Sequence, residues 1–138
     1  MEKPYDIRKL ESPVWETIGG ALTTYNTQQA GDDQSTPLCY VVEDSDGAIL
    51  GGVIGVIYWE WLSLDLMWVR EDLRGQGIGG RLLGLIEEEA RKQGAKHVHL
   101  DTFSFQAPEF YSKYGYTVFG QLADYPSGFK RFYMKKKL

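Results

Sequence analysis

The sequence predicts a mixed α/β fold in which an antiparallel sheet comes first and then alternates with helices. Two observations lead to this fold class. Residues 38–69 form three apolar or β-branched segments separated by turn signals. From residue 78 onward the apolar residues recur at helical spacing, and strand and helix patterns then alternate to the end of the chain. The length of 138 residues suits a single domain over 1–138.

The first half of the chain is expected to contain a helical segment and then a three-stranded meander. Residues 14–29 form one or two short helices, weakened by Gly19 and Gly20, and residues 28–37 form a polar loop. Strands follow at 38–43, 48–59 and 62–69. The dipeptide Asp46-Gly47 is a hairpin signal between the first two strands.

The second half begins with an amphipathic helix. Its apolar stripe consists of Ile78, Leu82, Leu83, Ile86 and Ala90. We expect the ion pairs Glu87–Arg91 and Glu88–Lys92 on the solvent side, and a helix end at Gly94. A strand at 97–102 comes next, then a helix that begins near residue 108 and ends at residue 115. Strands at 117–122 and 129–136 complete the fold, with three lysines at a solvated strand end.

Composition and charge exclude several classes of protein. The net charge of −4 and the pI of about 5.2 argue against nucleic acid or an anionic membrane as a partner. The longest apolar run, Gly51 to Trp59, is far shorter than the roughly 20 residues of a membrane helix. The charged N-terminus does not resemble a signal peptide. The single cysteine, Cys39, cannot form an internal disulfide and is expected to be buried. A cytoplasmic protein is therefore predicted.

The most informative segment is Arg74-Gly75-Gln76-Gly77-Ile78-Gly79-Gly80-Arg81, which follows a strand and opens a helix. Glycines allow a close approach of the backbone to a ligand. The first N–H groups of a helix lack partners, and the helix dipole with the two arginines favours an anion. The segment therefore predicts a binding site for a phosphate or pyrophosphate. A mobile strand-to-helix turn is the alternative.

The same glycines also fit a dinucleotide-binding pattern. Gly75, Gly77 and Gly80 match G-x-G-x-x-G, and Asp101 follows at about the spacing of a ribose-binding carboxylate. However, residues 70–74 separate the strand from the first glycine, and the chain lacks the two βαβαβ halves of a doubly wound sheet. A nicotinamide-dependent oxidoreductase is therefore a disfavoured alternative. No Lys-Ser/Thr follows the glycines, which excludes a P-loop.

Two motifs in this order resemble the GNAT superfamily of N-acetyltransferases, over about residues 38–138. The first is Val69-x-x-x-x-Arg74-x-x-Gly77-x-Gly79, and the second is Ser104-x-x-Ala107-x-x-Phe110-Tyr111-x-x-x-Gly115-Tyr116. The resemblance implies the acyl-CoA N-acyltransferase fold: a mixed, mostly antiparallel sheet of about six to seven strands flanked by about four helices.

The resemblance also implies that acetyl-CoA is the acyl donor and that no metal takes part. The pantetheine arm would run along Met67, Trp68 and Val69. The pyrophosphate would rest on backbone N–H groups of Arg74, Gly75, Gln76, Gly77, Ile78, Gly79 and Gly80. Ser104 stands where the family often has asparagine, so a contact with CoA is in question there, although a serine can still cap the helix that follows.

The resemblance assigns the protonation of the departing thiolate to Tyr111. The pKa values of a thiol and a phenol, about 8.5 and about 10, make this transfer reasonable. A packing aromatic is the alternative. Phe110 and Tyr114 lie i,i+4 and are expected on the core face, so that Tyr111 points elsewhere. Asp65 and Glu60 are the candidates for a carboxylate that removes the acceptor's proton through water, with solvated positions as the alternative.

His97, His99 and Asp101 share a face of one strand, so a metal site is conceivable, but ordinary surface or core positions are preferred. The predicted function is acetyl transfer from acetyl-CoA to a primary amine of a small molecule or peptide. A module that senses acyl-CoA without turnover is the alternative. Edge strands at the C-terminus could pair in a homodimer.

Overall fold

The computed structural model describes residues 4–138, so the expectation about a signal peptide rests partly on residues outside this range. The chain divides into two compact units, residues 1–33 and 34–138. The first contains α1 (Trp15–Ala30), a single helix that includes Gly19 and Gly20 and ends where the Gly31 N–H donates to the Thr27 carbonyl at 2.9 Å. The prediction of a single domain remains a prediction.

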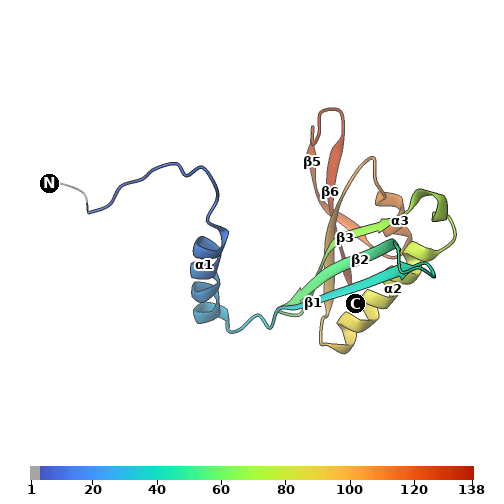
Figure 1. Cartoon of the computed structure of the whole chain (residues 1–138), viewed down its shortest axis with the longest axis horizontal. Coiled ribbons are helices and arrows are strands. Elements are labelled where there is room, and N and C mark those ends of the chain that lie inside the picture. Colours follow the sequence, from blue (N-terminus) through green and yellow to red (C-terminus); the bar gives the residue numbers. More distant parts are fainter. Residues whose placement is uncertain (1–3) are drawn as a thin grey trace. The chain divides into compact units, whose positions relative to one another are not determined.

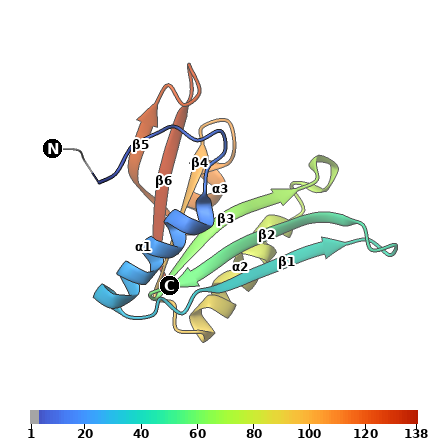
Figure 2. The same cartoon turned by 60° about the vertical axis from the view of Figure 1, so that its left-hand side comes forward.

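The second unit is built on one six-stranded sheet in the order β1-β2-β3-β4-β6-β5 (Figures 1 and 2). The strands are β1 (Thr36–Glu43), β2 (Ile49–Tyr58), β3 (Trp61–Val69), β4 (His97–Phe103), β5 (Thr117–Ala123) and β6 (Lys130–Lys137). Between them lie η1 (Glu71–Leu73), α2 (Ile78–Lys92) and α3 (Pro108–Lys113). The predicted mixed and mostly antiparallel sheet is confirmed.

The hairpin between β1 and β2 forms where the turn signal predicts it. The Asp44 Oδ1 atom accepts hydrogen bonds from the backbone N–H groups of Asp46 and Ala48, both at 2.9 Å. Gly47 has φ +83°, a left-handed conformation that costs glycine nothing. The tight turn sets the register of the meander, with Thr36 opposite Ile57 on the paired strand.

The one parallel pair of the sheet, β3 with β4, is short. It covers Trp61 with His97, Leu62 with Val98 and Ser63 with His99. Beyond these residues β3 runs on to Val69 without a partner on that side, while β4 stays paired with β6 through Phe103. Figure 2 shows β3 and β4 diverging toward their carboxyl ends. The separation opens the sheet at a position where α/β folds commonly bind ligands.

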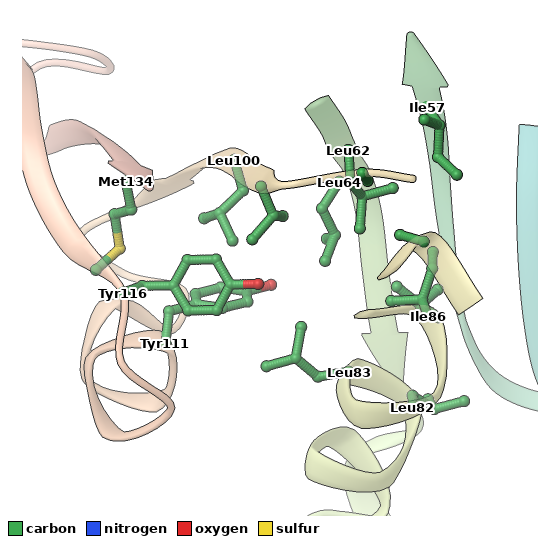
Figure 3. Close-up of a cluster of buried hydrophobic side chains, with 14 residues drawn as sticks. Ile57, Leu62, Leu64, Leu82, Leu83, Ile86, Leu100, Tyr111, Tyr116 and Met134 are labelled. Carbon is green, nitrogen blue, oxygen red and sulfur yellow. The ribbon is translucent and has the colours of Figure 1, made fainter. Parts of the chain in front are cut away.

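The core lies between the sheet and α2, which contacts β1, β2 and β3. The predicted stripe of α2 is buried, including Leu82, Leu83 and Ile86, and it meets alternate residues of β2 and β3 (Figure 3). At roughly 25 cal/mol per Å² of apolar area, this burial is the main source of stability. In residues 4–138 no helix is both long enough and apolar enough to cross a membrane.

The prediction of a buried Cys39 is wrong. Along β1 the side chains alternate, so Leu38, Tyr40 and Val42 pack against the core while Cys39 is exposed on the opposite face. Because the strand pattern is apolar on both faces, hydrophobicity alone does not tell which face is buried.

The predicted Glu87–Arg91 ion pair is also wrong. Glu87 is buried, accepts a hydrogen bond from the Tyr116 hydroxyl at 2.6 Å and pairs with the Lys136 ammonium at 2.8 Å. Burial and the hydrogen bond to Glu87 raise the pKa of Tyr116 well above its ordinary value. On the solvent side, Arg91 instead pairs with Glu88. The lysine-rich strand end therefore supplies an internal partner and is not wholly solvated.

Candidate active site

A cavity of about 930 Å³ occupies the space where β3 and β4 separate. The carboxyl half of β3, the glycine segment and the start of α2 form one side. The end of β4, the loop after it and α3 form the other. Eleven of the predicted site residues line it: Asp65, Met67, Trp68, Val69, Arg74, Gly75, Gly77, Ile78, Gly79, Gly80 and Tyr111. Residues as far apart in the sequence as Asp65 and Tyr111 therefore line one cavity.

A β-bulge in β3 changes which of its side chains face the core. The pairing with β2 shifts between Ile54 and Gly55, which leaves Asp65 as the extra residue of β3. Before the bulge Leu64 faces the core, and after it Met67 and Val69 do so. The bulge therefore breaks the strand's regular alternation at the point where β3 has left β4.

The glycine segment owes its shape to two left-handed residues. Gly75 has φ +79°, and Gly77, the residue that precedes α2, has φ +82°. The first helical N–H with a partner is that of Arg81, which donates to the Gly77 carbonyl at 3.1 Å. Within residues 4–138, the N–H groups of residues 75–80 have no hydrogen-bond partner. Such a run of free N–H groups at a helix N-terminus is suited to a phosphate or pyrophosphate.

Gly79 and Gly80 serve a different purpose that the sequence did not indicate. A Cβ atom on Gly80 would lie 2.2 Å from the Tyr114 hydroxyl, and one on Gly79 would lie 3.2 Å from the ring of Phe110. These glycines let α3 approach the first turn of α2. By contrast, a Cβ atom on Gly75 or Gly77 would meet open space, which is room that a ligand can use.

Arg74 supports the turn that leads into the glycine segment. Its Nε donates to the carbonyl of Val69 at 2.8 Å, across the 3₁₀ turn η1. The guanidinium is thereby held at the end of β3 and within the lining of the cavity. Its positive charge adds to that of the helix dipole, so this end of the cavity favours an anion.

Tyr111 lies on α3 with a buried side chain, and it lines the cavity. The expectation that it points away from the core is wrong, because Tyr111 belongs to the buried core, while Phe110 and Tyr114 are only partly buried. Its ring packs edge-to-face on Tyr116 with centroids 5.7 Å apart (Figure 3). Burial, together with the charge of Asp101, raises the pKa of Tyr111 to about 12. Its hydroxyl makes no hydrogen bond within residues 4–138. It is therefore a protonated phenol that is free to donate.

The two carboxylates proposed as bases lie in different places. Asp65 lines the cavity, and its Oδ1 accepts a hydrogen bond from the Ser63 hydroxyl at 2.7 Å. Glu60 lies in the tight turn before β3, is mostly exposed, and pairs with Lys96 at 3.4 Å. That turn precedes the end of β3 that is still paired with β4. The structure therefore brings Asp65 to the cavity and does not bring Glu60 there.

Ser104 and Gln76 are the other predicted residues that do not line the cavity. The Ser104 hydroxyl accepts from the Lys130 N–H at 3.0 Å, which ties the loop after β4 to β6. The expectation that Ser104 caps the next helix is wrong, since Ala107 precedes α3 and makes no side-chain cap. Instead the Thr102 hydroxyl accepts from the Ala107 N–H at 3.4 Å.

Sequence reasoning missed a second carboxylate of the cavity, Asp101, and its partner Arg131. Both the Nε and the Nη2 atoms of Arg131 contact Asp101 Oδ1, at 2.9 and 2.7 Å. The hydrogen bond to Asp101 raises the pKa of Arg131. From the sequence, Asp101 was considered only as a ribose-binding carboxylate of a dinucleotide site and, together with His97 and His99, as a metal ligand. Trp61 stacks on His97, and residues 4–138 contain no cluster of such side chains that could hold a metal.

Comparison with known proteins gives consistent results. The model of the acetyltransferase (GNAT) family matches residues 4–116. The chain is 34% identical over 122 residues to acetyltransferase Atu2258 of Agrobacterium fabrum, covering 88% of this chain and 89% of that protein. It is 39% identical over 93 residues to the blasticidin-S acetyltransferase of Streptomyces morookaense, covering 67% and 68%.

Among solved structures, an acetyltransferase from Bacillus cereus matches with a TM-score of 0.86 and 36% identity. The match covers 95% of this chain and 98% of that one. Since the match leaves out only 5% of this chain, the likeness includes most of the strands and helices that line the cavity.

Proposed function

This chain belongs to the GNAT acetyltransferase family and takes its acyl group from acetyl-CoA, and we propose that it acetylates a primary amine of a small molecule by direct attack. The observation behind the proposal is that one cavity joins an anion-binding backbone segment to a protonated phenol and two carboxylates. The first suits the donor, and the others suit the chemistry at an amine.

The residues present fit the donor. The free N–H groups of residues 75–80 would hold the pyrophosphate, with the arginine at position 74 adding charge. Met67, Trp68 and Val69 line the same cavity at the end of β3 and would flank the pantetheine arm. When bound, acetyl-CoA supplies a thioester carbonyl for the amine to attack and a thiol that leaves.

The balance of atoms assigns a role to Tyr111. A neutral amine forms the new N–C bond, the C–S bond breaks, the nitrogen releases one proton, and the sulfur takes one. A group that protonates the sulfur regains its proton from the one that the nitrogen releases, through water. Because its pKa is raised to about 12, Tyr111 is fully protonated at neutral pH and can supply the proton that the sulfur takes. A thiolate, with a pKa of about 8.5, is a weaker base than the phenolate, so the transfer costs a few kcal/mol and depends on close positioning.

The small-molecule class of the acceptor rests on the site and on one relative. The cavity is lined by apolar and aromatic side chains together with charged ones, namely Asp65, Arg74, Asp101, Lys113 and Arg131. Pockets for small ligands combine apolar surface with such polar groups. The relative with the higher identity is named for acetylation of blasticidin-S. A peptide amine, the other predicted acceptor, would need an extended groove beside the cavity.

The test is a screen for thiol release from acetyl-CoA in the presence of separate panels of small amines and of peptides with free N-termini. We expect amine-dependent release with members of the first panel, and mass spectrometry should find one added acetyl group. Release only with peptides would overturn the proposed acceptor class. Acetyl-CoA binding without release by any amine would instead favour a sensing module.

A further inference from the structure

The two carboxylate oxygens of Asp101, which lies where β3 and β4 separate, have different partners. It lies two residues past His99, the last β4 residue paired with β3. Both contacts from Arg131 go to one oxygen, Oδ1. Within residues 4–138, the other oxygen, Oδ2, accepts no hydrogen bond. Asp101 lines the cavity, and a carboxylate with one oxygen bound by an arginine and the other without a hydrogen bond can accept one from a ligand.

The charged and polar groups around Asp101 indicate what kind of ligand would bind at its Oδ2 atom. From β3, the Asp65 carboxylate faces the same cavity. From β6 comes Arg131, which is already bound to Oδ1 and also donates to the Tyr125 hydroxyl at 3.0 Å. From α3 comes the neutral Tyr111 hydroxyl, whose pKa responds to the Asp101 charge. The lining also contains Lys113 from α3 and, at the donor end, Arg74, so the lining as a whole is not negative. The preference for a cation rests on the Oδ2 atom of Asp101, which Arg131 leaves free, and on the Asp65 carboxylate of the same cavity.

The wall beside Asp101 is aromatic. Phe103 and Phe105 both line the cavity and stack on one another with centroids 5.3 Å apart. Phe129 packs against the edge of Phe105 at 5.2 Å and supports it. More than half of the Phe105 surface is exposed, although phenylalanine side chains are usually buried. An apolar or aromatic body could cover this surface while its charged end reaches Asp101.

We propose that the Oδ2 atom of Asp101 binds the ammonium group of the acceptor, and that the acceptor is a cationic primary amine carried on an apolar or aromatic body. This inference rests on the proposed function and narrows its substrate class. Asp101 is the group that holds the nitrogen near the Tyr111 hydroxyl. The ammonium must lose one proton before its nitrogen can attack, and the carboxylate that holds it can accept that proton.

The experiment measures binding, so that it does not require the natural acceptor. Benzylammonium and benzyl alcohol, which have nearly the same shape, are titrated into enzyme saturated with CoA, and binding is followed calorimetrically or by ligand-observed NMR. The wild type should bind benzylammonium at least about tenfold more tightly than benzyl alcohol. Asp101→Asn should reduce benzylammonium binding by roughly ten- to a hundredfold and leave benzyl alcohol unchanged.

The control variant is Glu60→Gln, which removes a carboxylate outside the cavity and should bind benzylammonium as the wild type does. Equal binding of the two probes by the wild type, or undiminished benzylammonium binding by Asp101→Asn, would overturn the proposal. So would a loss seen in Asp65→Asn and not in Asp101→Asn. If neither the wild type nor any variant binds CoA, the proposed function itself is contradicted. CoA binding is therefore measured first, so that this outcome is distinguished from a failure of the Asp101 proposal.

Discussion

The two ends of the cavity are built in different ways. The donor end consists mainly of backbone: two left-handed glycines and a run of N–H groups at the start of α2. The other end consists of side chains from separate elements, namely Asp65 on β3, Asp101 on β4 and Tyr111 on α3. Backbone geometry requires glycine at fixed spacings and so leaves a motif in the sequence. At the other end Tyr111 belongs to the second motif, but the carboxylates that the strands supply, Asp65 and Asp101, leave no motif of their own.

This difference implies that the two ends should fail separately. Changes in the glycine segment should weaken donor binding, because they remove the conformation that presents the N–H groups. Changes among the side chains should slow turnover or weaken acceptor binding while the donor still binds. Each prediction below tests whether the ends are as independent as their construction indicates.

The largest effect is expected for Gly77→Asp. A non-glycine residue at φ +82° costs about 1–2 kcal/mol, and a carboxylate beside a pyrophosphate adds repulsion of a few kcal/mol. Together they should weaken acetyl-CoA binding by about a thousandfold, measured by isothermal titration calorimetry. Gly84→Asp is the control, because Gly84 lies on the same helix with open space around it and normal φ. Near-wild-type affinity of Gly77→Asp would contradict the assignment of the phosphate site.

Within the same motif, Gly80→Ala should have a smaller effect of another kind. Its Cβ atom would meet the Tyr114 hydroxyl at 2.2 Å, so α3 must shift or the ring must rotate. We expect a loss of about 1–3 kcal/mol in the free energy of unfolding, typical of overpacking. Tyr114→Phe in the same chain should restore part of it in denaturant unfolding. A loss that is independent of residue 114 would show that the contact is not the cause.

The pH profile sharpens the comparison at the side-chain end. Since the pKa of Tyr111 is raised to about 12, its hydroxyl stays protonated as the pH rises through 10, where an ordinary tyrosine would be half ionised. At saturating amine, kcat should therefore not fall between pH 8 and 10. In Asp101→Asn one cause of the raised pKa is removed, so any decline should begin at lower pH than in the wild type. A wild-type decline centred near pH 10 would contradict this.

The smallest effects are expected for the two carboxylates first proposed as bases. Glu60→Gln should keep kcat/KM within about twofold, because Glu60 is exposed, pairs with Lys96 and lies outside the cavity. Asp65→Asn changes a cavity residue and should lower kcat/KM by about tenfold or less. Initial rates of thiol release with the best amine from the screen measure both. A larger loss for Glu60→Gln than for Asp65→Asn would contradict the conclusion that Asp65 lies in the active-site cavity and Glu60 outside it.

Much of the fold could be predicted because its signals are local. The period-two and helical patterns located the strands and α2, and the turn glycines located their ends. Burial was harder to predict where both faces of an element carry plausible residues. Cys39 on β1 and Glu87 on α2 were misplaced because their environments depend on β6 and on which sheet face α2 covers.

The same reasoning explains what was missed in the site. Asp101 and Arg131 are brought together by the pairing of β4 with β6, in which Asp101 lies opposite Tyr133 and Phe103 opposite Arg131. A sequence without an alignment carries no signal for that register. Ser104 was expected at a helix cap because of the motif it occupies. However, α3 begins only at Pro108, so Ser104 lies in the loop before the helix and Ala107 takes the position that precedes it.

The most direct test of the division between the two ends is Tyr111→Phe, assayed for both donor binding and turnover. The substitution removes one hydroxyl that makes no hydrogen bond within residues 4–138 and keeps the packed ring. We expect the Kd for acetyl-CoA to be unchanged and kcat to fall by about a hundredfold, the usual contribution of a general acid. Unchanged kcat, or a rise in Kd that matches the loss of rate, would contradict the account.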